Sequence, residues 1–299
     1  MINLKKTNKN KKKIKKQSFF QSIAVLMFSQ IIIKILGLVY KWYLTNKEGF
    51  GDKGNAIYSA GFSIYALLLT ISSTGVPNAV SKLVSERISK ADYRGAHRIF
   101  KISLITFAII GLIGTLIMFF GASFISNNLL DIKEAELTLV ALSPSIFFVA
   151  IISVFRGYFN GRQNMKATAN SQSIEQLFKT FFTILIVEII FILSKANTNL
   201  MAAGANLATT MATLVSFIYL YTYYKIRRKE LANEIVKSKN YKARSIIKTI
   251  KNILAVSIPM SLSSILTSLN RNIDSITVNR SLQTFLSKEE ALKQYGILS

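Results

Sequence analysis

Residues 99–126 read IFKISLITFAIIGLIGTLIMFFGASFIS, and this stretch decides the class of the fold. Lys101, near its beginning, is the only ionisable residue in it. A helix needs about 20 largely apolar residues to cross a hydrocarbon core of about 30 Å, and this stretch exceeds that length. The sequence therefore predicts a membrane-spanning helix here.

Six further windows are long and apolar enough to span a membrane, and only short polar connections separate them. The composition agrees, because 51% of the residues are hydrophobic and 17% are charged, against about a quarter in soluble domains. We predict an all-α integral membrane protein with about seven transmembrane helices in one bundle. The additional windows are approximately 18–41, 56–80, 138–159, 172–194, 200–224 and 252–279.

Basic residues alternate in density from one side of this predicted bundle to the other. The segments 1–17, 81–101, 160–170 and 225–251 together carry 26 Lys and Arg residues. The segments expected on the opposite side, which are 42–55, 127–137, 195–200 and 281–299, carry 6. Short loops rich in Lys and Arg remain on the cytoplasmic side, so we predict a cytoplasmic N-terminus.

The first apolar window also has to be distinguished from a signal peptide. The apolar core of a signal peptide has about 7–15 residues and ends at a small-residue cleavage site. The window at 18–41 is longer and has no Ala-x-Ala exit. We expect it to remain as the first span.

Several classes of protein are excluded by what the chain contains. The formal charge of +24 does not indicate a nucleic-acid partner, because the basic residues lie between apolar runs rather than on one soluble face. Cysteine is absent, so there is no disulfide framework or thiolate nucleophile. Phosphate-binding loops, metal-binding helices and nucleophile elbows are not found, so we predict no enzyme and no metal. His97, in a basic segment, is expected to be a solvated loop residue.

Ionisable residues inside the predicted spans are the candidates for function, because each costs roughly 2.5–3.5 kcal/mol to insert. In the first span, Gln30, Lys34, Gly37 and Lys41 recur at spacings that place them on one helical face. This face is expected to line a cavity for substrate. The alternative for Lys41 is that its chain extends to the outer interface beside Trp42.

Arg156 lies close to the end of the fourth span and is a second basic candidate for substrate binding. A role as a positive anchor at the membrane surface is the alternative. The neighbouring Gly157-x-x-x-Gly161 spacing would let another helix backbone approach closely.

The fifth span places Gln172, Glu175, Gln176 and Lys179 on one face. Glu175 and Lys179 are four residues apart and can form an ion pair, which serves either to lock the bundle or to contact substrate. Glu188 has no obvious local partner in the sequence. It is a candidate for binding a coupling ion or a proton, with an interfacial position as the alternative.

The last span holds a dense polar group in Asn270, Arg271 and Asp274. Arg271 and Asp274 are three residues apart and could neutralise each other. We predict that this part of the helix lines water or substrate, with Asn270 and Arg271 binding substrate and Asp274 in an ion pair or coupling role.

Five strings, in order along the chain, resemble the polysaccharide biosynthesis/stage V sporulation protein B group of the multidrug/oligosaccharidyl-lipid/polysaccharide exporter superfamily. They are KILGLVYK (34–41), STGVPNAVSKLVSE (73–86), LSPSIFF (142–148), RGYFNGRQNM (156–165) and SIEQ (173–176). The resemblance implies about 14 helices in two lobes around a central cavity. On it, residues 18–224 are a six-helix first lobe, 225–251 a basic cytoplasmic linker and 252–299 the first helix of a truncated second lobe, after a basic tail at 1–17.

The resemblance also implies a function and a place in the cell. Lys34 and Lys41 stand at or next to basic positions of the related lipid II flippases, whereas the neighbourhood Ser72-Ser73-Thr74 lacks the basic residue of their second helix. We expect a flippase for an undecaprenyl-pyrophosphate-linked oligosaccharide or peptidoglycan precursor in a bacterial cell membrane. Its expected partners are the lipid-linked sugar, membrane lipids and the cell-wall synthesis machinery.

Two alternatives stay open at this point. One is a cation-coupled multidrug exporter of the same superfamily, in which Glu175, Glu188 and Asp274 would carry the coupling by H⁺ or Na⁺. The other is a non-transporting accessory or scaffold protein of the membrane. None of these readings calls for a cofactor.

Overall fold

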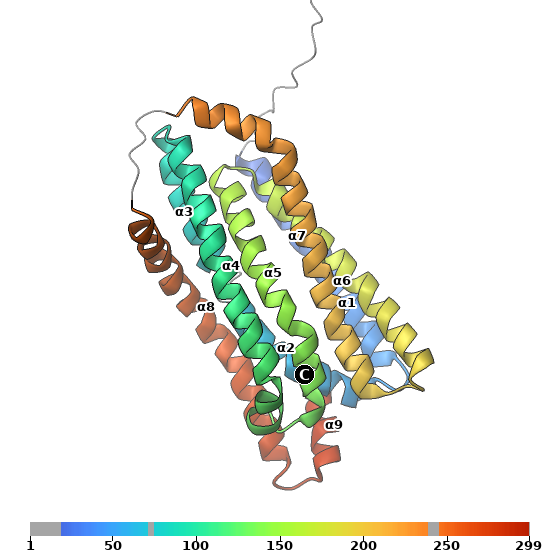
Figure 1. Cartoon of the computed structure of the whole chain (residues 1–299). Coiled ribbons are helices and arrows are strands. Elements are labelled where there is room, and N and C mark those ends of the chain that lie inside the picture. The colour runs from blue at the N-terminus through green and yellow to red at the C-terminus, as the bar shows by residue number, and fades with distance from the viewer. Residues whose placement is uncertain (1–18, 71–74, 239–244, 299) are drawn as a thin grey trace, which may run out of the picture.

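The structure is a computed structural model that describes residues 19–70, 75–238 and 245–298 of the chain. Side chains are described within these ranges except at 19–23, 263, 265–276, 279–280 and 298. All regular structure within the described ranges is helical, as the sequence predicted (Figure 1). The chain is therefore an all-α protein.

The long helices run side by side as a bundle (Figure 1). The helix α5 packs against α2, α3, α4 and α7, while α1 and α6 pack together beside α7. Two clusters of buried apolar residues, one toward each end of the bundle, hold these helices together. The elements are α1 (Phe19–Asn46), α2 (Gly51–Thr70), α3 (Val76–Ser89), α4 (Tyr93–Phe124), the π-helix η2 (Ile125–Leu129), the 3-10 helix η3 (Lys133–Ala135), α5 (Glu136–Gly161), α6 (Met165–Leu193), α7 (Thr198–Val236), α8 (Ile246–Leu282) and α9 (Lys288–Leu298).

Five helical segments in the described part are long and apolar enough to cross a membrane, and they coincide with five of the expected windows. The window at 56–80 coincides with α2 and α3, and residues 71–74 between them lie outside the described part. The window at 252–279 lies within α8. The number seven therefore stays a prediction. The five segments are Ala24–Asn46, Tyr93–Leu129, Lys133–Gly161, Met165–Leu193 and Thr198–Val236.

The outer surface of the bundle carries large apolar side chains. On α4, Ile105, Ile117 and Phe120 are exposed, and on α1 Leu38 and Trp42 are exposed. Extended apolar surfaces of this kind are rare on soluble monomers, whereas a lipid bilayer covers them at no cost. The surface therefore agrees with a multi-pass membrane protein.

The close approach predicted at Gly157 and Gly161 is confirmed, and its partner is α3. A Cβ atom built on Gly157 would lie 2.7 Å from the carbonyl oxygen of Pro77, and one on Gly161 would lie 2.7 Å from that of Ser81. Since real Cβ atoms do not approach this closely, only glycine allows α3 and α5 to pack at this distance.

The expectation for His97 was wrong, because α4 begins before it. Asp92 caps the helix by accepting a hydrogen bond of 2.8 Å from the N–H of Gly95, and it forms a 2.9 Å ion pair with Arg87. His97 is thus a half-buried residue of a helix, and its ring packs on Tyr158 and Tyr224. A capping aspartate satisfies the free N–H groups of the first turn, so the helix begins here.

The helix α7 is longer than the membrane-spanning window expected at 200–224. The helix α7 continues to Val236, well into the segment 225–251 that was expected to be a linker. Lysine, arginine, glutamate, leucine and alanine make up most of residues 225–232, and these residues favour helix. An ion pair between Arg162 and Glu234 attaches the extension to the end of α5.

The last helix, α9, packs on α2 and begins with a reciprocal cap. The Ser287 hydroxyl donates to the Glu290 carboxylate over 2.7 Å, and the Glu290 N–H donates to Ser287 Oγ over 3.3 Å. These hydrogen bonds favour the charged carboxylate and lower the pKa of Glu290. The cap fixes where α9 turns back toward α2.

Candidate functional site

Arg156 is the centre of a polar network that joins three helices. Its guanidinium lies 2.6 Å from the carboxylate of Glu175 on α6. It also donates to Ser171 on α6 over 2.9 Å and to Ser216 on α7 over 3.3 Å. The side chains of Arg156 and Glu175 are 12% and 26% exposed. Such a network neutralises both charges inside an otherwise apolar bundle.

The ion pair expected between Glu175 and Lys179 is replaced by the pair between Glu175 and Arg156. Lys179 lies instead between aromatic rings, with its ammonium 4.9 Å from the ring centre of Tyr40 and 4.5 Å from that of Phe62. Its side chain is buried, and no carboxylate of the described residues lies within ion-pair distance of it. Ring faces attract cations but do not neutralise them. Lys179 is therefore a buried cation that an anionic ligand could neutralise.

Glu188 has two partners that the sequence spacing did not reveal: Tyr43 on α1 and Lys47, which directly follows that helix. Its carboxylate lies 2.6 Å from the ammonium of Lys47 and accepts a 2.7 Å hydrogen bond from the hydroxyl of Tyr43. The ammonium of Lys47 is also 3.9 Å from the ring centre of Phe191. Lys47 was counted only as a loop cation, because its distance to Glu188 along the sequence hides the contact.

Lys41 joins α1 to α2 and, through it, to α9. The ammonium of Lys41 donates to Asn55 over 2.8 Å, and the Asn55 amide donates to the carbonyl oxygen of Gly296 over 2.7 Å. A Cβ atom on Gly296 would overlap the carbonyl oxygen of Asp52, so the contact between α2 and α9 is very close. Lys41 therefore has a structural partner in this conformation.

The face of α1 that was expected to line a substrate cavity contacts α6 at two positions. The Gln30 amide donates a 3.0 Å hydrogen bond to Gln172 on α6, and Gly37 lies near Gln176 on the same helix. Lys34, between them, is exposed and makes no ion pair with the described residues. Its role as a substrate-binding residue stays a prediction.

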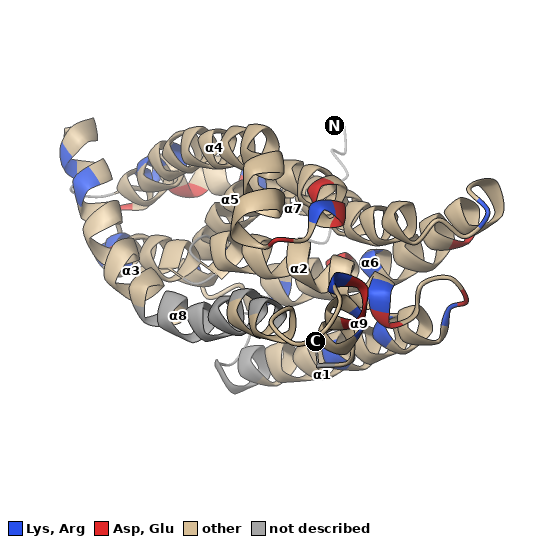
Figure 2. Ribbon diagram, turned by 90° about the horizontal axis from the view of Figure 1, so that it is seen from below, with Lys and Arg blue, Asp and Glu red and all other residues tan. Residues whose placement is uncertain are grey.

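The polar group Asn270, Arg271 and Asp274 lies within α8, but its side chains are outside the described residues. The predictions made for these three residues therefore remain open. Figure 2 looks along the bundle and shows that most of the ribbon is free of Lys, Arg, Asp and Glu. Few charged residues lie within the membrane-spanning helices, so those on α5 and α6 are the main candidates for function.

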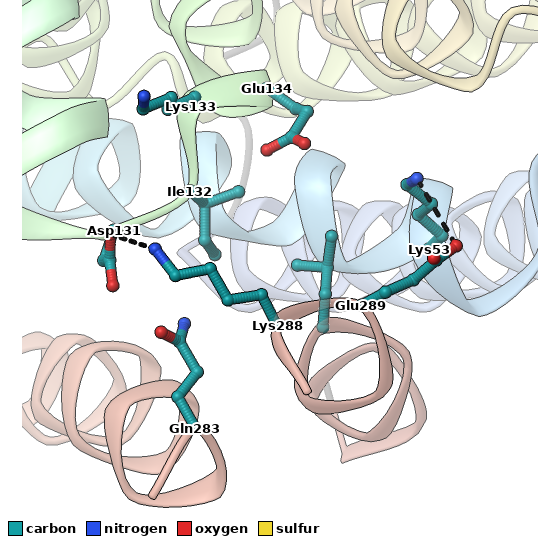
Figure 3. Close-up of a pocket in the computed structure, with 9 residues that line it drawn as sticks. Lys53, Asp131, Ile132, Lys133, Glu134, Gln283, Lys288 and Glu289 are labelled. Carbon is teal, nitrogen blue, oxygen red and sulfur yellow. Dashed lines mark ion pairs between the residues drawn. The ribbon is translucent and has the colours of Figure 1, made fainter. Parts of the chain in front are cut away.

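A pocket of about 380 Å³ lies where α9 and the end of α8 meet α2 and the connection between α4 and α5 (Figure 3). Two ion pairs cross it: Lys288 lies 3.6 Å from Asp131, and Lys53 lies 3.9 Å from Glu289. Because these charges are already paired and largely exposed, we interpret the pocket as a polar contact between α9 and the bundle rather than as a ligand site.

Comparison with known proteins adds the evolutionary relationship. Residues 19–288 match the family described as polysaccharide biosynthesis protein. The chain is 29% identical over 290 residues to stage V sporulation protein B of Bacillus subtilis (strain 168), covering 95% of this chain and 54% of that protein. It is 30% identical over 218 residues to the lipid II flippase MurJ of the same strain, covering 69% of this chain and 39% of that protein. The chain thus spans about half the length of the curated relatives it matches.

Solved structures share the fold. A MATE structure in complex with Br-NRF has a TM-score of 0.64 at 18% identity, over 95% of this chain and 65% of that one. An inward-facing MATE transporter of the MOP superfamily has a TM-score of 0.65 at 18% identity, over 94% of this chain and 60% of that one. These proteins are named as transporters, a flippase and a sporulation protein, in agreement with the expectation of a non-enzymatic membrane protein. The chain belongs to the polysaccharide biosynthesis protein family.

Proposed function

We propose that this chain forms part of a flippase that moves an undecaprenyl-pyrophosphate-linked oligosaccharide or peptidoglycan precursor across the bacterial cell membrane. The observation that carries the proposal is Lys179, a buried cation between two aromatic rings with no carboxylate partner in the described part of the chain. A buried charge without a counter-charge is costly, and a pyrophosphate in the membrane would supply one. The relative named as a lipid II flippase supports a substrate of this chemistry.

Lys179 is also well placed for such a contact. It lies on α6 one turn after Glu175, which pairs with Arg156. Its neighbours Tyr40 and Phe62 belong to α1 and α2. Aromatic faces suit the lipid and sugar parts of a substrate, while the ammonium provides a charge-assisted hydrogen bond to phosphate oxygen. No bond has to be broken in such a step.

Binding of a pyrophosphate lipid should depend on Lys179. We expect Lys179→Gln in the purified full chain to weaken binding of fluorescent undecaprenyl-pyrophosphate oligosaccharide by about tenfold or more, since a charge-assisted hydrogen bond contributes about 1.5–3 kcal/mol. The measurement is fluorescence anisotropy in detergent, with undecaprenol as the ligand that lacks phosphate.

Lys166→Gln is the matched control, because Lys166 is an exposed cation at the beginning of the same helix. It should leave the affinity unchanged. Equal affinity of the Lys179→Gln and unchanged chains would contradict the proposed contact. Binding of cationic drugs in place of the pyrophosphate lipid would favour the multidrug exporter. In that exporter Glu175 and Glu188 would bind the coupling ion, so their ion pairs with Arg156 and Lys47 would have to open.

The cytoplasmic position of the N-terminus is part of the same proposal and can be tested separately. The chain has no cysteine, so single cysteines can be introduced directly. We expect a membrane-impermeant maleimide added to intact cells to label Glu48→Cys and Phe285→Cys but not Gln163→Cys and Lys237→Cys. All four positions are exposed, and the two pairs lie at opposite ends of the bundle. The reverse labelling pattern would invert the topology.

A further inference from the structure

A second pocket lies at the other end of the bundle, between α4 and α7. It has a volume of about 240 Å³ and opens at the point where the apolar part of each helix meets its charged part. Its lining is basic and aromatic and contains no carboxylate. The lining residues are His97, Lys101, Tyr221, Tyr224, Lys225, Arg228, Ala232 and Ile235.

The cations of this pocket form no ion pair with any residue that the structure describes. Lys101, Lys225 and Arg228 are exposed, and none of the ion pairs among the described residues includes them. The ring of His97 is stacked against Tyr224, and its Nδ1 is buried without a hydrogen-bond partner in the part of the chain that the structure describes. Three cations in a lining that has no carboxylate make this a site for an anion with several oxygens.

An apolar surface continues from the pocket along both helices. On α4, Ile105 and Ile109 follow Lys101 at spacings of four, and on α7 Leu214 and Ile218 precede Tyr221 at spacings of three and four. Residues at these spacings lie on the same face of a helix. All four are exposed, and α4 contacts α7. The α4–α7 seam, defined by these four residues, thus extends the basic pocket with an apolar surface.

We propose that the pocket binds the headgroup of an anionic phospholipid, with an acyl chain lying along the α4–α7 seam. The phosphate is held by Lys101, Lys225 and Arg228, beside the ring of His97, which lines the same pocket. A basic pocket between helices at the membrane surface has the chemistry of a headgroup site, and tyrosines are common at this depth. Free inorganic phosphate would make no use of the seam.

The test measures lipid binding to the delipidated full chain by native mass spectrometry, with phosphatidylglycerol, phosphatidylcholine and inorganic phosphate as probes. The unchanged chain should retain phosphatidylglycerol in preference to phosphatidylcholine. The variant Lys101→Gln/Lys225→Gln/Arg228→Gln should weaken this retention on the order of 100-fold, the product of about fivefold for each basic residue near an anionic surface.

Two further variants keep the proposal falsifiable. The control Lys82→Gln/Lys229→Gln/Lys237→Gln removes the same charge from exposed positions that do not line the pocket, and it should retain the lipid. Ala232→Phe fills the pocket from an exposed helical position, keeps every charge and should release the lipid. The proposal is overturned if the control loses as much lipid as the pocket variant, if Ala232→Phe binds normally, or if phosphatidylcholine or inorganic phosphate competes equally.

Discussion

Replacing Gly157 and Gly161 together by alanine should lower the free energy of unfolding by about 2–6 kcal/mol, because each substitution forces α3 away from α5. The atoms that a new Cβ would meet are the carbonyl oxygens of Pro77 and Ser81, each at 2.7 Å. These are backbone atoms, so a change of side-chain rotamer cannot relieve the contact. Unfolding of the purified variant in detergent, followed by circular dichroism with increasing denaturant, measures the effect.

Gly121→Ala is the matched control for this prediction. Gly121 also lies in a long apolar helix, but a Cβ atom there would meet only the side chain of Ile125, at an ordinary 3.7 Å. Alanine favours a helix over glycine by about 1 kcal/mol, so this substitution should leave the stability unchanged or raise it. If the glycine pair on α5 responds as Gly121 does, the two helices do not pack as described.

Arg156→Met should destabilise the folded chain by about 3 kcal/mol, at the lower end of the range for breaking a buried ion pair. The loss leaves the carboxylate of Glu175 without its 2.6 Å partner and two serine hydroxyls without a donor. The lower end applies because the Glu175 side chain is 26% exposed and part of its charge can be solvated. The measurement is again unfolding by denaturant in detergent.

A double-mutant cycle separates the ion pair from other effects of the substitution. Adding Glu175→Gln to Arg156→Met removes the unpaired charge, so the double variant should be more stable than the sum of the single losses predicts. Lys90→Met is the control, since Lys90 and Glu86 form an exposed 2.9 Å pair whose loss should cost less than about 1 kcal/mol. Additive losses at Arg156 and Glu175 would show that the two side chains do not interact.

A close contact between helices can be predicted from sequence where it depends on the spacing of small residues within one helix. The Gly157-x-x-x-Gly161 spacing predicted a close helix contact, and the structure adds that the partner is α3. The prediction that His97 lies in a loop was wrong, because Asp92 caps α4 and this helix begins earlier than the apolar pattern indicates. Apolar periodicity locates the membrane-spanning part of a helix but not the polar turns that extend it.

The candidate site shows a similar division. The sequence predicts functional roles for Arg156, Glu175, Lys179 and Glu188, because charges inside apolar spans are costly and therefore few. It paired Glu175 with Lys179, the nearest opposite charge on the same helix. The structure pairs Glu175 with Arg156 on α5 and Glu188 with Lys47, which directly follows α1. Partners on other helices cannot be read from sequence spacing.

The sequence by itself determined that this protein is an all-α membrane protein, and the length and apolarity of its helices were sufficient for that. It also determined which few charged side chains lie within the membrane-spanning helices, since their positions follow from the apolar windows that contain them. Only the tertiary structure decided which of these charges neutralise one another and that Lys179 lies between aromatic rings from two other helices. The physical reason is that helix-to-helix contacts depend on how whole surfaces pack, whereas membrane insertion depends on each helix separately.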